Sequence, residues 1–488
     1  MSRLADKLPL TVSLSGLSFG SHAVWSTLAL STVALGVLLR DLSAGQGAAV
    51  WFGYAADLGL TVYLLCEVNV LARIVKTTVW LTLLLALAAL LTWPSGWQVV
   101  AQGLDRSTTV AAILAAMGFM VEAARTSPLI RRVGYTVIQQ PKSRRYVVLT
   151  TGAHLLAIVL NVGAINLLGN MVRRSNTLAA AGGDAQLQAQ RLRESSVAII
   201  RGFGTMAMWS PLSIGFAVAL ASVPSLHWQE LLPFAMALSL SYLLLGWLLD
   251  GVHWKTAAVI KNSSPRADWR AVNGFVALIL AVIAAALAAA FALHASVSDG
   301  VMLVVPPVAL LWLVRQYARA GASAALALTA RRMRQRLFQI FPGFRTEICM
   351  IASGALLGTL LGHALHLQAI PALLVQAALH PLLLAALLLL AIIAVAQLGV
   401  GAVVGIGIVS AAIPDPALLG LKPVVLAFVF LSSWVLAGGI TPYGATIAIM
   451  ARAAEVPGRI VALRWNGRFT LAGYAVSLAW FATLQAWT

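Results

Sequence analysis

Residues Gly438–Met450 read GGITPYGATIAIM and lie between two apolar runs, VVLAFVFLSSWVLA and RWNGRFTLAGYAVSLAWFATLQAW. The flanking runs suit membrane helices, whereas the quoted segment places three glycines and a Thr-Pro pair within seven residues. Proline removes a backbone donor and glycine weakens a helix, so a continuous helix is disfavoured here. The sequence therefore predicts a membrane helix that is interrupted near Thr441–Gly444.

The composition is typical of a protein that crosses a membrane many times. Of the 488 residues, 60% are hydrophobic and only 10% are charged. The net charge of +18 would suit a nucleic acid, but the basic residues are scattered between apolar segments. We therefore expect contact with a lipid bilayer and no nucleic-acid partner. The two cysteines, Cys66 and Cys349, predict neither a disulfide framework nor a metal site.

Apolar segments of about 20 residues, the length that crosses a bilayer as a helix, recur along the whole chain. Eleven of them lie near residues 21–39, 50–68, 77–93, 107–123, 201–222, 231–250, 271–294, 301–318, 346–366, 423–450 and 469–487. Two further stretches, 146–172 and 379–413, fit poorly as single crossings. The predicted fold class is an all-α polytopic membrane protein with about 11 transmembrane helices plus two re-entrant hairpins.

Positive charge predicts the orientation of these segments. Arginine-rich segments flank 146–172 on both sides, so this hairpin should enter from the cytoplasm, and 379–413 should enter from the outside. With this topology, 30 of the 33 Lys and Arg residues are cytoplasmic, and the exceptions are Arg40, Arg106 and Lys422. The predicted location is a bacterial inner membrane, with a cytoplasmic N-terminus and a periplasmic C-terminus.

A weak internal repeat divides the chain. MWSPLSIGFAVALASVP (Met208–Pro224) parallels GGITPYGATIAIMARAAEVP (Gly438–Pro457), and a predicted hairpin precedes each copy. Five crossings separate the copies, so they should be inverted relative to one another. The predicted domains are scaffold helices in 1–106, a first repeat in 107–250 with hairpin 146–172 and broken helix 201–222, and a second repeat in 251–488 with hairpin 379–413 and broken helix 423–450.

Interrupted helices at membrane depth leave backbone amides and carbonyls free to bind a solute or an ion. The residues expected to bind substrate are Asn161, Gly163, Asn166, Ser210, Ser213, Gln397, Gly399, Thr441, Tyr443 and Thr446. Those expected to serve a coupling ion are Asn161, Ser210, Gly401, Thr441 and His154. The alternative is that the breaks are packing kinks, that the polar side chains bond between helices, and that His154 is a hydrogen-bonded core histidine.

The acidic residues favour an anionic or neutral solute. Glu122, Asp250, Glu347 and Asp415 fall at the ends of apolar segments, and none falls in a break or hairpin tip. A cation site would be expected to place one there. The sequence lacks the G-x-S-x-G, H-E-x-x-H and G-x-x-x-x-G-K motifs. We therefore expect no enzymatic activity, no metal and no cofactor other than a possible Na+ coupling ion.

The order of hairpin, broken helix, span and inverted copy over residues 107–488 resembles the ion transporter superfamily. This group includes divalent anion–sodium symporters, citrate and arsenite permeases, and the large membrane subunit of tripartite transporters. The resemblance implies a homodimer whose transport domain moves like an elevator against a scaffold. In the symporter branch it also implies a Ser-Asn-Thr triplet in each hairpin tip. Here the tips read LNVGAIN and AQLGVGAVV without that triplet, so Na+ and H+ coupling both remain open.

The predicted function is secondary active transport, of the elevator type, of a small anionic solute across the inner membrane. Two alternatives remain open. One is the large membrane subunit of a binding-protein-dependent tripartite transporter, which would need a small partner subunit. The other is a lipid flippase or another lipid-handling membrane protein.

Overall fold

The computed structural model describes residues 22–251, 267–365, 370–376 and 379–487. Within these ranges the chain is helical and forms no strand, and 12 helices are long and apolar enough to cross a membrane. The predicted class of all-α polytopic membrane protein is confirmed. The N-terminal 21 residues lie outside the described ranges. The topology count therefore includes residues of which the structure says nothing, namely Arg3, Lys7, Lys255, Lys261 and Arg266.

Eleven of the 12 candidate spans overlap the eleven predicted crossings. They are built from α1 (His22–Leu42), α2 (Ala48–Glu67), α3 (Arg73–Thr92), α4 (Gly96–Arg125), α8 (Ala185–Trp209) with α9 (Ile214–Ala221), α10 (Trp228–Gly246), α11 (Trp269–Ala292), α12 (Val297–Tyr317), α14 (Arg345–Ala364), α18 (Pro423–Ile440) with α19 (Ala445–Ala454), and α20 (Gly467–Trp487). The twelfth begins with α16 (Pro381–Val395), the first arm of the second predicted hairpin.

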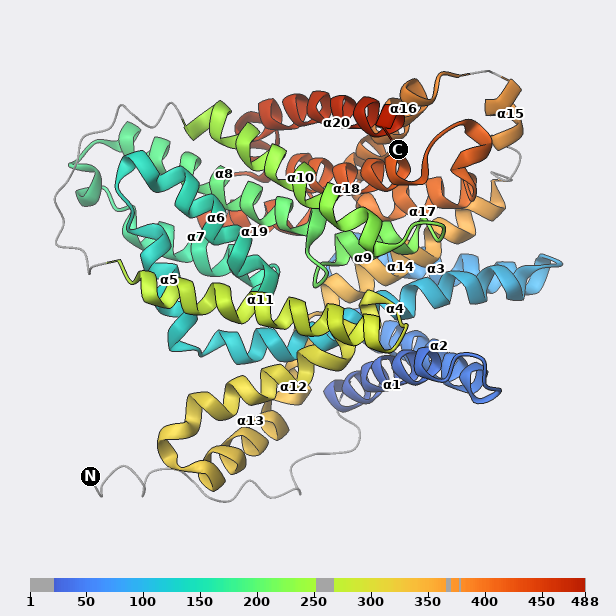
Figure 1. Ribbon diagram of the computed structural model, residues 1–488, viewed down its shortest axis with the longest axis horizontal. Helices are drawn as coiled ribbons and strands as arrows, with labels where there is room; N and C mark the ends of the chain where they lie inside the picture. Colours follow the sequence, from blue (N-terminus) through green and yellow to red (C-terminus); the bar gives the residue numbers. More distant parts are fainter. Residues whose placement is uncertain (1–21, 252–266, 366–369, 377–378, 488) are drawn as a thin grey trace.

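The remaining helices are shorter, more polar, or both. They are α5 (Pro128–Ile138), α6 (Lys142–Leu160), α7 (Gly163–Ser175), α13 (Ala322–Gly343), α15 (Ile370–Gln376) and α17 (Ala402–Ala412). The pair α6 and α7 lies toward one end of the long axis in Figure 1, and the pair α16 and α17 toward the other. Whether each pair enters and leaves on one side of a membrane stays a prediction.

Two helices begin earlier than the hydrophobic pattern indicates. The α4 helix starts at Gly96, directly after Pro94 has helped to end α3, and it runs unbroken through residues 106 and 107. The α8 helix starts inside a polar segment, because the Asp184 side chain accepts hydrogen bonds from the amides of Gln186 and Leu187. Hydropathy alone could not locate either start, since both lie in segments that contain polar residues.

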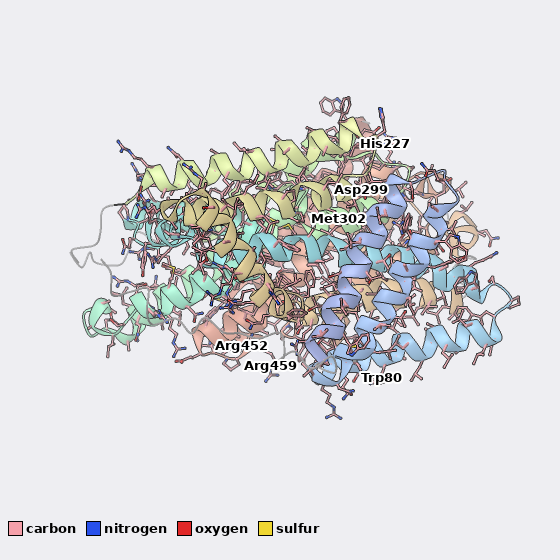
Figure 2. The ribbon with its side chains drawn as sticks, turned by 90° about the horizontal axis from the view of Figure 1, so that it is seen from below. Trp80, His227, Asp299, Met302, Arg452 and Arg459 are labelled. Carbon is pink, nitrogen blue, oxygen red and sulfur yellow. The ribbon has the colours of Figure 1, made fainter. Side chains whose placement is uncertain are left out.

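The N-terminal helices present apolar side chains outward, as membrane helices do. On α3 the exposed residues include Leu84 and Leu91, and Trp80 is 39% exposed. Figure 2 shows Trp80 at the lower edge of the molecule, whereas His227 and Asp299 lie toward the upper edge. An exposed apolar face of this kind suits hydrocarbon rather than water.

The same order of elements occurs twice along the chain. A long helix, a short helix, a helix pair, a broken helix and a final helix follow one another as α4 to α10, and again as α14 to α20. The two broken helices, α8–α9 and α18–α19, contact each other near the middle of the fold (Figure 1). The order of elements is thus repeated, with α11 to α13 between the two occurrences. The predicted bounds of the repeats and the inversion of one relative to the other stay predictions.

A buried polar group, here called the Arg201 cluster, joins helices from both halves. Arg201 of α8 is 2% exposed and lies 2.6 Å from Asp250 Oδ2. Its guanidinium donates to Tyr146 Oη at 3.0 Å and to Asn466 Oδ1 at 3.1 Å, and it lies 4.6 Å from the centre of the Phe469 ring. A buried charge requires such partners. The cluster therefore fixes α6, α8 and the end of α10 against the start of α20.

A glycine-lined contact joins α14 to α17. A Cβ atom on Gly358 of α14 would lie 2.8 Å from the Cα atom of Gly407. One turn before and one turn after, Gly354 and Gly362 face Val403 and Ala411 at similarly close range. Within a bilayer no hydrophobic force drives helices together. Small residues instead stabilise the contact, because they let two helix backbones approach closely. The α17 helix, the second of the pair α16 and α17, thus packs directly against the backbone of α14.

Candidate functional site

Both helix pairs turn through backbone conformations that are rare for residues with side chains. The α6 helix ends at Leu160, and Asn161 then adopts φ 48° and ψ −133° before α7 begins at Gly163. In the second pair, Gly399 has φ 89° and Gly401 has φ 77° before α17 begins at Ala402. Glycine adopts such angles without strain, and asparagine tolerates positive φ better than most residues. The turns lie at the tips that the sequence predicted.

Both broken helices are interrupted where a hydroxyl residue precedes proline. The α8 helix ends at Trp209, and α9 begins after Ser213, whose side chain accepts from the Phe216 amide at 3.2 Å. The α18 helix ends at Ile440, and α19 begins after Gly444. A proline cannot donate the backbone hydrogen bond that a continuous helix needs at that position. The break predicted at Thr441–Gly444 is confirmed.

All four interruptions meet at one cavity of about 140 Å³. The first tip contributes Asn161 and Val162, and the second contributes Gly399 and Gly401. The first broken helix contributes Leu212, Ser213, Ile214 and Gly215, and the second contributes Thr441, Tyr443, Gly444, Ala445 and Thr446. Segments more than 200 residues apart in sequence thus form one wall. A cavity lined by interrupted helices can offer backbone amides and carbonyls to a solute.

Of the predicted site residues, seven line this cavity: Asn161, Ser213, Gly399, Gly401, Thr441, Tyr443 and Thr446. Gln397 is not in the wall but is bonded to it, because its Nε2 donates to Thr441 Oγ1 at 3.2 Å. The second tip is therefore tied to the second broken helix by side chains as well as by proximity.

The other predicted residues lie away from the cavity wall. Gly163 opens α7, and Asn166 is exposed one turn further on. Ser210 is fully buried, and its hydroxyl has no partner among the described residues. Ser210 does not line the cavity, so its predicted role in coupling stays a prediction.

His154 of α6 is held on both sides of its ring. Trp209 Nε1 donates to His154 Nε2 at 2.9 Å, and His154 Nδ1 lies 3.1 Å from Thr205 Oγ1. The Trp209 bond requires Nε2 to be an acceptor, which places the ring proton on Nδ1. Protonating His154 would break that bond. The side chain is 6% exposed and does not line the cavity, so the geometry fits the hydrogen-bonded alternative.

Most of the cavity wall is apolar, and sequence reasoning missed this part. Phe203 of α8, Trp434 of α18 and Met350 of α14 are among its members. Glu347 in the first turn of α14 also lines it, although its position at the start of an apolar segment suggested an interfacial residue. The sequence gives no local signal that the first turn of α14 lies beside the four breaks.

The comparisons with known proteins find likeness in structure alone. No family model and no curated protein matches the chain. The YdaH transporter of Alcanivorax borkumensis, described as having an unusual topology, aligns at 14% identity with a TM-score of 0.47, over 85% of this chain and 98% of that one.

MtrF of Neisseria gonorrhoeae, described as illuminating a class of antimetabolite efflux pumps, aligns at 12% identity with a TM-score of 0.51 over 84% of this chain and 96% of that one. At this identity the likeness to MtrF shows a shared fold and nothing narrower. The chain thus shares its overall fold with MtrF.

Proposed function

We propose that the protein is a secondary active transporter that carries a small anionic solute across the bacterial inner membrane. The observation that carries this proposal is the convergence of four helix interruptions on one cavity. Interrupted helices of this kind form the substrate and ion sites of many secondary transporters. The likeness of fold to MtrF supports transport in general.

An anionic solute is favoured by the helix starts at the cavity. The first residues of three helices line it, namely Ile214 of α9, Ala402 of α17 and Ala445 of α19. The start of a helix carries a partial positive charge and free amides, which suit an anion. The apolar side chains of Phe203, Trp434 and Met350 would bury an apolar body. A monocarboxylate with an apolar group fits both features.

The proposed mechanism is elevator-like movement, in a homodimer, of the two helix pairs and two broken helices against a scaffold that includes α1 to α3. Asn161, Ser213, Thr441, Tyr443 and Thr446 would contact the solute, and a Na+ or H+ gradient would drive its movement. The direction of transport is left to experiment. A binding-protein-dependent transporter would differ in requiring a further protein, and a lipid flippase would move lipid rather than a soluble anion.

The test uses the purified chain in proteoliposomes, with uptake and binding of a panel of monocarboxylates and dicarboxylates and with the ion gradients set separately. Asn161→Gly removes the amide while keeping the backbone angles accessible, and Thr441→Val removes a hydroxyl at constant shape. Losing a hydrogen bond to a charged group should weaken anion binding by roughly 10- to 100-fold.

Matched controls are Asn170→Ala on the exposed side of α7 and Thr92→Val at the end of α3, which should leave binding unchanged. Normal binding and uptake by both site variants would refute the proposed site. Uptake by the chain alone would exclude a required binding protein. Lipid scrambling without anion uptake would favour the flippase.

A further inference from the structure

Glu347 is an acidic residue in a cavity proposed to hold an anion. It lies in the first turn of α14, and its half-buried side chain forms part of the wall with Met350 and Ile351 of the same helix. The opposite parts of the wall come from the breaks, including Tyr443 and Thr446. A carboxylate and an anionic solute would therefore share one small space.

No basic side chain among the described residues pairs with the Glu347 carboxyl, whose hydrogen bond comes from its own backbone amide. Arg345, two residues earlier, is already engaged. Its Nε donates to the Pro342 carbonyl at 2.7 Å and lies 3.4 Å from Oε2 of the fully buried Glu67 of α2. The nearest cation on the same helix is thus directed to another carboxylate.

Among the described residues, the basic side chains of the helices packed against α14 have other partners or are exposed. On α4 and α13, Glu122 and Arg332 pair with each other at 2.7 Å. Arg106 of α4 donates to Ser410 Oγ at 3.3 Å and lines a different pocket, with Ala355 and Gly407. On α3, Lys76 donates to Asn69, and Arg73 is exposed. The α17 helix carries no titratable side chain.

The other titratable groups nearby carry no positive charge. They are the phenol of Tyr63 on α2, which donates to the Phe341 carbonyl, the buried thiol of Cys349 on α14, and the phenol of Tyr443 in the second break. None of them can neutralise a carboxylate by forming an ion pair. Glu347 therefore faces the cavity without a counter-charge from the described residues.

We propose that Glu347 is the proton-coupling residue of the cavity, and that its carboxyl must be protonated for an anionic solute to occupy the site. The residue would take up a proton from the aqueous side to which the cavity is open, forming one O–H bond, and would release that proton to water on the other side. Proton and anion would then cross together. That the solute is an anion rests on the function proposed above, whereas proton uptake by Glu347 can be measured without any solute.

The size of the effect follows from the cavity. Two negative charges about 6 Å apart at an effective dielectric constant of about 20 weaken binding by roughly 100-fold. The helix start beside Glu347 favours its charged form, but that effect is worth less than about tenfold in most settings. Repulsion therefore exceeds the helix contribution whenever an anion is present. Anion binding should weaken about tenfold per pH unit above the titration midpoint and level off near 100-fold.

The first experiment needs no solute. The infrared absorption of protonated carboxyl groups is recorded for the full-length protein in lipid, from mildly acidic to mildly alkaline pH. We expect one titrating carboxyl to disappear in Glu347→Gln and to persist in Glu230→Gln, an exposed control in the first turn of α10. An identical titration in wild type and Glu347→Gln would overturn the inference.

The second experiment measures binding of phenylacetate, a monocarboxylate with an apolar body, to the same three proteins across the same pH range. Wild type and Glu230→Gln should bind more weakly as pH rises, whereas Glu347→Gln should bind equally at every pH. The same pH dependence in all three proteins would overturn the coupling role. If phenylacetate and the wider anion panel fail to bind any of them, the proposed anionic substrate is wrong, while the infrared titration still decides whether Glu347 takes up a proton.

Discussion

Replacing Asp250 with asparagine should destabilise the fold more than replacing its partner Arg201 with methionine. Arg201 is 2% exposed, so Asp250→Asn leaves a buried cation with neutral partners only. Asp250 is 17% exposed and also lies 3.4 Å from Arg193, so it retains water and a second cation when Arg201 is lost. Removing one partner of a buried pair costs about 3–5 kcal/mol. We expect Asp250→Asn to fall in this range and Arg201→Met to cost roughly half as much.

The assay is the free energy of unfolding of the purified protein in mixed micelles, measured for both single variants and for the double variant. The double variant should be more stable than Asp250→Asn alone, because no unpaired buried charge remains. Arg193→Met is the control, and it should cost no more than about 1 kcal/mol because Arg193 is 42% exposed. If Arg201→Met proves the costlier of the two single changes, the argument from unequal burial is refuted.

Two further predictions concern stability. Gly358→Val should destabilise the protein by about 2 kcal/mol or more, because its Cβ would meet the Gly407 backbone, whereas Gly274→Val on an open face of α11 should cost less than about 1 kcal/mol in the same unfolding assay. Asp268 caps α11, and hydrogen bonds from the Ala271 amide and from Arg132 lower the pKa of its carboxyl. A depressed pKa gives stability that is present at neutral pH and lost as pH falls through the folded-state value. Asp268→Asn should therefore lower the melting temperature at neutral pH and have little effect in strong acid. An equal effect at both pH values would contradict this.

The interruptions were predictable because their causes are local. The Ser-Pro pair before α9 and the Thr-Pro pair before α19 remove a backbone donor within an otherwise apolar run. Gly399 and Gly401 supply the positive φ angles that the second tip requires. Asn161 does the same at the first tip. Each of these features can be read within a few residues of sequence.

The contents of the cavity were less predictable because they depend on long-range packing. Glu347 reaches the wall only because α13 passes into α14 through a short turn, so that the first turn of α14 lies inside the fold. The bond from Gln397 to Thr441 joins residues 44 positions apart. Arg201 is among the 30 basic residues that the charge pattern places in the cytoplasm, yet its side chain is almost completely buried against Asp250. Counting basic residues predicts on which side of the membrane a segment lies, but it does not predict which charged side chains are buried inside the protein.

The small residues in the contact between α14 and α17 recur at a regular interval on both helices. Gly354, Gly358 and Gly362 are spaced every four residues, and so are the facing positions Val403, Gly407 and Ala411. Four residues of helix advance about 6 Å. A shift of α17 along α14 by that step would replace Gly407 opposite Gly358 with Val403 or with Ala411, and a Cβ on Gly358 would already lie within 3.1 Å of the α17 backbone. The closest backbone approach, between Gly358 and Gly407, therefore belongs to a single register, which keeps the second tip beside the first turn of α14.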